Sequence, residues 1–456
     1  MAIFISVLCV LIIVISLLLV ILRPVWVFYL FLTAAAFNSI LAGYIYRANN
    51  LGLPITWGPA DFLSWLTLIA ALFVPCVKCT NSSVIRKAVF ILVLLSAISL
   101  LQGMVMSPRN ALTHSRVVHF AAASVFALRY FTDYNRVKGF LRFCVALLLV
   151  MFVLHTLIRL GIYQPPISET ERLVEAGGLI GERGTRSLIP MFYLVLVSLA
   201  LGRISGRAGS FLVSIFILLV GLAGVVLSET RSTYGAIAVM LSASLIFMRG
   251  RMKISVIFVL AGLIAVCAAT ALGFDFLARF RSNYGQGDYS LPSYYQYRQS
   301  WRGIEYKTII SSYRRQPYFL LLGRGVGAMH PAAIGIDPEV AFYHSEYLGW
   351  LDRCGLLGLA ALLILFFACL WRSFALARSD IPYLRSFGAA MFLLMTALAA
   401  DGFFHPVFSH YRAAALLICF VAILANWQQI YMSLTEQQEF SEEEQTDLEP
   451  VTADSD

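Results

Sequence analysis

The chain has 456 residues, of which 60% are hydrophobic and 13% are charged, and its mean hydropathy is +0.80. Soluble domains carry roughly 45–50% apolar and about 25% charged residues, so this composition excludes a water-soluble globular protein. Such a high apolar content also excludes a disordered chain. The sequence therefore predicts an all-α, polytopic transmembrane helical bundle.

The net charge of +9 is unevenly distributed along the chain. Residues 436–456 contain nine acidic residues and no Lys or Arg, so the rest of the chain is more basic than the total suggests. The basic residues are scattered between apolar segments and do not gather on one domain, which argues against a nucleic-acid partner. On a membrane protein such an excess first indicates topology and contact with membrane lipids.

Apolar runs of about 20 residues, long enough to cross a bilayer, recur along the whole chain. The first is interpreted as an anchor helix, because a signal peptide would begin with Lys or Arg. We expect about 12–13 helices in total. Most lie in a transmembrane region 1–273, and the last three lie within 345–434. The predicted spans are 3–22, 25–46, 60–77, 88–106, 115–131, 140–162, 187–203, 209–228, 232–248, 253–273, 346–371, 384–403 and 412–433.

Orientation follows from the basic short loops, because Lys and Arg favour the cytoplasmic side. When the predicted helices alternate, these loops all fall on one side: 78–87, 136–142, 203–207, 249–253 and 372–385. The loop 274–344, with its amphipathic stretches, then lies in the periplasm. The acidic tail 435–456 is predicted to be disordered and cytoplasmic.

Cysteine usage does not indicate a metal or redox site. Five of the eight cysteines lie inside apolar runs, where cysteine behaves as a small hydrophobic residue. Cys76 and Cys79 form a CxxC motif, but no second pair or histidine cluster accompanies them. We therefore expect no metal and no cofactor.

Arginine is frequent on the predicted periplasmic side, where the positive-inside rule disfavours it. Guanidinium forks match phosphate oxygens, so an anionic ligand on this face would explain the excess. Solvated loop charges are the alternative. The residues are Arg172, Arg183, Arg186, Arg231, Arg279, Arg281, Arg298, Arg302, Arg314, Arg315, Arg324 and Arg412.

Arg231 belongs to the polar hexapeptide 228–233, which lies between two strongly apolar runs. Ionisable groups at membrane depth are costly and usually mark function. The alternative is an arginine that snorkels from a helix end.

Two further clusters follow in the long loop. The first contains Arg298, Trp301 and Arg302, and the stretch 294–313 around it has the pattern of an interfacial helix. The second is the turn Gly323–Gly327, whose amides could bind an anion or could be ordinary loop punctuation.

His344 stands where the loop enters a helix, a position suited either to general-base chemistry or to a plain interfacial residue. Glu346 and Asp352 are alternative bases. A position one helical turn below His344 is, however, more easily structural. Gly355 and Gly358 would allow close helix packing.

Together these residues resemble the O-antigen ligase superfamily over roughly residues 190–370. That group includes O-antigen ligases, Wzy-type polymerases and oligosaccharyltransferases that act on proteins. The family's usual His-Asn pair is His344-Ser345 here. The resemblance rests on Arg231 between two helices, Arg298-x-x-Trp301 before a Gly-x-Gly turn, and His344 heading a helix that continues Gly355-Leu-Leu-Gly358-Leu359.

The resemblance implies an inverting, metal-independent glycosyltransferase at the periplasmic face of the bacterial inner membrane. Its donor would be a glycan on undecaprenyl diphosphate, and its acceptor lipid A-core or another glycan. Arg231 and Arg298 would hold the diphosphate, and His344 would take the proton of the acceptor hydroxyl. Further substrate contacts are expected from Arg186, Trp301, Arg302, Arg324, Tyr347 and Arg412.

Three other functions compete with this interpretation. A polysaccharide polymerase shares the chemistry and differs in acceptor, and we favour the ligase. A transporter would show internal repeats around a midplane site, and the sequence contains no convincing repeat. A scaffold subunit of an export machine is the third alternative.

Overall fold

The computed structural model describes the greater part of the membrane region and pieces of the long loop. The described residues are 18–37, 59–75, 83–106, 108, 111, 117–160, 162–163, 191–228, 231–248, 309–314, 316–327, 330–331, 339–340, 345–403, 405, 407–408 and 411–435. The predicted span 253–273, nearly all of 3–22 and the tail 436–456 lie outside them.

The described residues are almost entirely helical, which confirms the all-α class. Two short strands, β1 (His330–Pro331) and β2 (Glu339–Val340), pair antiparallel in the loop. The helices are α2 (Pro24–Ala36), α4 (Pro59–Phe73), α5 (Val84–Met106), α7 (Val117–Tyr130), α8 (Tyr134–Arg159), α11 (Met191–Gly206), α12 (Phe211–Ser228), α13 (Arg231–Ser244), α17 (Phe319–Leu322), α18 (Glu346–Leu376), α19 (Pro382–Asp401) and α20 (Tyr411–Ala425).

Several helices could span a membrane, as expected of a multi-pass protein. Within the described ranges, α5, α8, α18 and α19 are long and apolar enough, and a fifth span results if 413–425 and 427–435, bent by 61°, count as one. Shorter apolar helices occupy five more predicted spans: α2, α4, α7, α11 and α12. The total of 12–13 spans stays a prediction.

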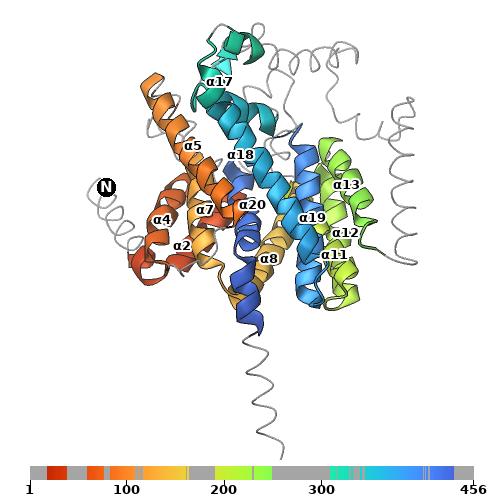
Figure 1. Ribbon diagram of the computed structural model, residues 1–456. Helices are drawn as coiled ribbons and strands as arrows, with labels where there is room; N and C mark the ends of the chain where they lie inside the picture. The colour runs from red at the N-terminus through yellow and green to blue at the C-terminus, as the bar shows by residue number, and fades with distance from the viewer. Residues whose placement is uncertain are drawn as a thin grey trace, which may run out of the picture.

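The helices form two groups around a central pair. In Figure 1, α2, α4, α5 and α7 lie on the left, α11, α12, α13 and α19 on the right, and α18 and α20 between them. Helix α11 is apolar all round and accordingly buried, packed between α12 and α19. Gly202 makes this packing possible, because a Cβ there would come within 2.5 Å of the Ser386 carbonyl oxygen.

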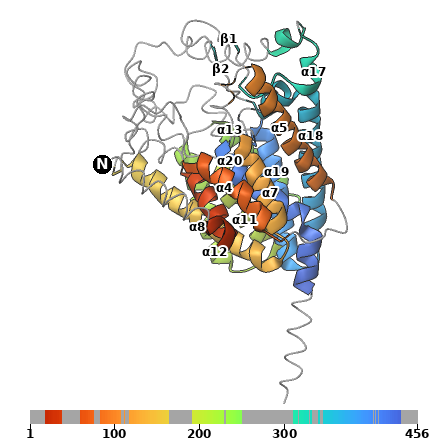
Figure 2. The same cartoon turned by 90° about the vertical axis from the view of Figure 1, so that its left-hand side faces the viewer.

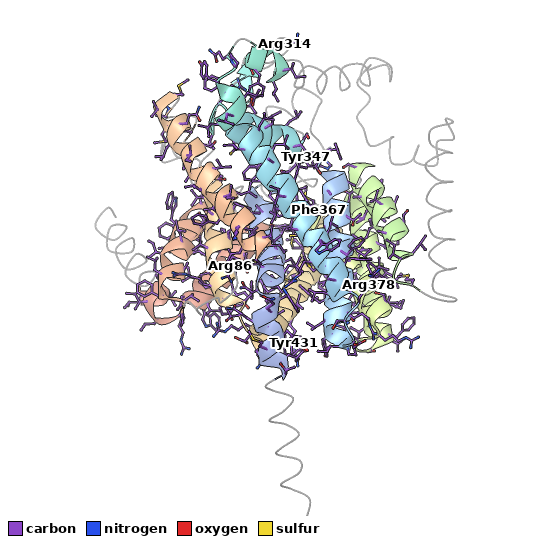
Figure 3. The ribbon with its side chains drawn as sticks, in the orientation of Figure 1. Arg86, Arg314, Tyr347, Phe367, Arg378 and Tyr431 are labelled. Carbon is purple, nitrogen blue, oxygen red and sulfur yellow. The ribbon has the colours of Figure 1, made fainter. Side chains whose placement is uncertain are left out.

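The basic turns gather at one end of the bundle, here called the basic end, where α11 and α18 end and α5, α8 and α19 begin. There Arg86 donates to the Asn426 side chain, Arg385 Nη2 lies 3.2 Å from the Gly206 carbonyl, and the Arg372 guanidinium stacks 3.9 Å from the Trp427 ring centre. In Figure 3, Arg378 and Tyr431 lie toward this end. The membrane side that it faces stays a prediction.

Helix α18 reverses direction at Gly355, whose φ of 66° and ψ of −163° are not helical. An unbroken helix would separate residues 347 and 366 by about 28 Å. The ring centres of Tyr347 and Phe366 are instead 6.4 Å apart, and a Cβ on Gly358 would lie 3.3 Å from the Trp350 carbonyl oxygen. A first arm, 346–354, therefore folds back beside a second arm, 356–376. Figure 2 shows α17 beside the upper ends of α5 and α18, near this reversal.

Candidate functional site

The structure describes the predicted site residues unevenly. Arg324 and Tyr347 are described with their side chains, whereas Arg231 and Arg412 are placed only by their backbones, in the first turns of α13 and α20. The remaining five lie outside the described residues: Arg186, Arg298, Trp301, Arg302 and His344.

The first arm of α18 begins against the end of α19. The amide of Glu346 donates to the Gly402 carbonyl at 2.8 Å, and the Ser345 hydroxyl lies 3.3 Å from the same oxygen. Tyr347 strengthens this contact, since its hydroxyl donates to the Ala399 carbonyl at 2.7 Å. Ser345, which directly follows His344 in the sequence, thus lies beside the end of α19, and Figure 3 shows Tyr347 in this part of the bundle.

The fully buried carboxylate of Glu346 is held by three N–H donors. It accepts from the amides of Val407 at 2.7 Å and Phe408 at 3.0 Å, and from Trp350 Nε1 at 2.6 Å. A buried charge needs such bonds. The structural interpretation of Glu346 is thus the better supported one: it fastens the loop after α19 to the first arm.

A cluster that sequence reasoning missed joins α13 to the end of α19. Ser232 Oγ lies 2.7 Å from His405 Nδ1, and the same nitrogen lies 3.1 Å from Asp401 Oδ1. The Asp401 side chain is fully buried, whereas that of His405 is 30% exposed. The signal was present in the sequence, since aspartate and histidine four residues apart at the end of an apolar run face each other on a helix.

The starts of three helices therefore meet at one end of the bundle, opposite the basic end. We call this the polar end and define it by Ser232, Glu346, Asp401 and His405. Arg231 is the chain neighbour of Ser232, and Arg412 follows Phe408 by four residues at the start of α20. Ser232 and Glu346, which are 114 positions apart in the sequence, thus both bond to the segment that follows α19.

Arg324 occupies a different place, at the far end of the first arm. Its Nε and Nη2 each lie 2.9 Å from an oxygen of Asp352, whose side chain is fully buried. This is a bidentate pair of the kind that fixes geometry. Arg324, expected to contact substrate, and Asp352, expected as an alternative base, thus neutralise each other's charge. This pairing accounts for the position of the Arg324 guanidinium.

The turn Gly323–Gly327 closes the end of the first arm. The amide of Arg324 donates to the Asp352 carbonyl at 2.7 Å, that of Gly325 to Arg353 at 3.3 Å, and that of Val326 to Ser99 on α5 at 2.9 Å. The prediction that these amides bind an anion is therefore wrong for all three. The amides of Arg324 and Gly325 satisfy carbonyls that the end of the first arm leaves without partners, and that of Val326 attaches the turn to α5.

Two hydroxyls complete this closure. Tyr313 donates to the Leu351 carbonyl at 2.6 Å, and Ser99 to that of Arg353 at 2.8 Å. Burial raises the pKa of Tyr313, so its phenol keeps the proton that it donates. The loop segment 313–326 and α5 together hold the first arm in place.

No grouping of three or more His, Cys, Asp or Glu side chains suited to a metal ion occurs within the described ranges. No protein-family model matches the chain, and no curated protein matches it either. The function is therefore inferred from the chemistry of the polar end.

Proposed function

We propose that the protein is an O-antigen ligase-type glycosyltransferase of the bacterial inner membrane. It transfers a glycan from undecaprenyl diphosphate to an acceptor hydroxyl at the periplasmic face. The observation that supports this is that Ser232, next to Arg231, and Glu346, two residues after His344, both bond to the segment 401–408, which leads to the start of α20 at Arg412. Sequence alone singled out these three positions.

In this proposal the polar end holds the leaving group. Arg231 and Arg298 bind the diphosphate and stabilise the charge that develops as it departs. The first turn of α13 adds to this, because helix N-termini carry partial positive charge and free amides. The guanidinium fork suits the task, since it meets two phosphate oxygens at once.

The acceptor side belongs to His344. The acceptor oxygen attacks the anomeric carbon, the bond from that carbon to the diphosphate oxygen breaks, and its electron pair leaves with the diphosphate. His344 takes the hydroxyl proton, as a general base positioned beside the attacking atom does. Attack opposite the leaving group inverts the anomeric centre.

The acceptor distinguishes ligase from polymerase, and we favour lipid A-core. The test is a reconstituted assay in which the full-length protein receives a purified undecaprenyl-diphosphate-linked glycan and either lipid A-core or a second copy of the donor. We expect glycan on lipid A-core. Lengthening of the donor chain alone would assign a polymerase, and no product from either acceptor would contradict a transferase and favour a transporter.

The orientation is tested separately with reporter fusions. Alkaline phosphatase fused after residue 310 should be active, and green fluorescent protein fused after residue 456 should fluoresce. A phosphatase that is active after residue 456 would overturn the placement of the last helix.

A further inference from the structure

The pairing of His405 leaves one of its ring nitrogens available. Nδ1 faces both Asp401 and Ser232, at 3.1 and 2.7 Å. Over the described part of the chain, the nearest recorded partner of Nε2 is the Ser232 hydroxyl at 3.5 Å, at the outer limit of a hydrogen bond. With both nitrogens protonated, the ring can bond to Asp401 through Nδ1 and still donate from Nε2.

A second Asp–His pair in the same bundle can be compared with Asp401 and His405. Asp61 and His119 also lie 2.9 Å apart, between α4 and α7. Their side chains are 6% and 1% exposed, and the His119 ring packs edge-on against Phe31. The pair at Asp401 differs in that its histidine side chain is 30% exposed and bonded to the neighbour of Arg231.

The surroundings of His405 suit an anion. It lies at the first turn of α13, where the fully buried Thr233 hydroxyl has no hydrogen-bond partner in the part of the chain that the structure describes. Buried hydroxyls are normally satisfied, so this one can take a further partner, and so can Asp401 Oδ2, which also has none among the described residues. Phosphate oxygens are acceptors suited to hydroxyls and helix amides alike.

We infer that His405 completes the leaving-group site: its Nε2–H donates to the diphosphate, and Asp401 positions the ring. This rests on the proposed function and adds a third N–H donor to those of Arg231 and Arg298. During transfer the bond from the anomeric carbon to the diphosphate oxygen breaks, and the electron pair stays on that oxygen. His405 keeps its proton, while the acceptor's proton goes to His344.

The test measures binding of sugar-free undecaprenyl diphosphate to the full-length protein in lipid nanodiscs, titrated by native mass spectrometry. His405→Ala should weaken binding about 10- to 100-fold, the value of one hydrogen bond to a charged group. The same substitution should weaken the binding of undecaprenyl monophosphate less. His405→Gln retains an N–H donor and should recover part of the loss.

Asp401 is tested as a positioning residue by a double-mutant cycle. Asp401→Asn alone should weaken diphosphate binding less than His405→Ala does. Adding it to His405→Ala should cost nothing further, because the two act as one unit. His119→Ala and Ser242→Ala are the matched controls, a histidine of the other pair and an exposed hydroxyl on α13, and both should bind diphosphate normally.

Three results separate the possibilities. Wild-type diphosphate affinity in His405→Ala overturns the inference. If transfer then also falls, His405 acts on the acceptor. If wild-type protein transfers no glycan while diphosphate binding still depends on His405, the proposed function fails and the anion site stands.

Discussion

The two ends of the bundle deal with charge in opposite ways. At the basic end, three arginines contact neutral groups, namely the Asn426 amide, the Gly206 carbonyl and the Trp427 ring, and the Arg136–Asp133 ion pair is partly exposed. At the polar end, two fully buried carboxylates, Glu346 and Asp401, are surrounded by N–H donors and a histidine. Burying ionisable groups in an apolar bundle is costly and marks functional sites, whereas capping a helix end with arginine serves stability. Substitutions at the two ends should therefore affect different properties.

The largest expected effect at the polar end is that of His344→Ala. Turnover should fall roughly 10²- to 10⁴-fold if His344 is the general base. Donor binding should be nearly unchanged, because the residue acts on the acceptor. The reconstituted transfer assay, run beside a donor titration, measures both quantities. Near-normal turnover would place the base elsewhere, and Glu346, already bonded to three donors, would be a poor replacement.

Arg231→Lys gives the most direct contrast between the ends. We expect a loss of about 10²–10³ in transfer rate, because a charge-assisted contact that tightens in the transition state is lost. A lysine is a point charge and cannot replace a fork. Arg385→Lys, at the basic end, is the matched control and should transfer at nearly the wild-type rate. Equal transfer rates for Arg231→Lys and Arg385→Lys would contradict the functional difference between the two ends.

The Arg324–Asp352 pair can be tested by exchanging its members. Arg324→Asp or Asp352→Arg alone should destabilise the protein by about 3–5 kcal/mol, because each leaves a buried charge without its partner. The double exchange should recover part of that loss. Thermal unfolding in detergent measures the stability, and the transfer assay measures the function. A stable but inactive double variant would show that Arg324 contacts substrate after all.

At the basic end, Asn426→Ala should lower stability and leave chemistry unchanged. The Asn426 amide donates to the carbonyls of Leu128 and Phe131 at 2.8 and 2.9 Å and accepts from Arg86. Its loss should cost about 1–3 kcal/mol, the penalty for buried groups left unpaired. Thermal unfolding should show the change. Transfer rates measured well below the unfolding temperature should match those of the wild type. A large drop in the transfer rate would show that the basic end also affects function.

The smallest expected effect is that of chelation. The leaving group is held by arginines in our proposal, so EDTA should leave the transfer rate unchanged. A metal site requires three or four converging ligands, and the described residues contain no group of three or more His, Cys, Asp or Glu side chains that could hold a metal ion. Loss of transfer in EDTA, restored by Mg²⁺ or Mn²⁺, would contradict the arginine account.

The helices were predictable because the bilayer sets their length. Apolar runs of about 20 residues gave α5 and α19 to within four residues at each end, whereas α8 begins six residues before the predicted span does. The polar interruption at Arg231 was equally visible, since the structure places it between α12 and α13.

The reversal at Gly355 was not predictable. A glycine in an apolar helix predicts close helix packing. Gly355 does pack on the Leu321 carbonyl, but the chain also reverses direction there. The reversal depends on donors from Tyr313, Gly325 and Ser99, which are distant in sequence. The Gly323–Gly327 turn has the same local pattern whether it binds an anion or caps a helix. Only tertiary partners distinguish the two.

The bonds of Glu346 also constrain the order of membrane insertion. Its carboxylate is satisfied by the amides of Val407 and Phe408, which the ribosome delivers some sixty residues later, beyond α19. Until then a charged side chain would enter lipid with two of its three donors missing, so the first arm should stay in water. The second arm of α18 should therefore be threaded during synthesis and the first arm docked only after α19 is in place. The polar end would then be the last part of the bundle to assemble.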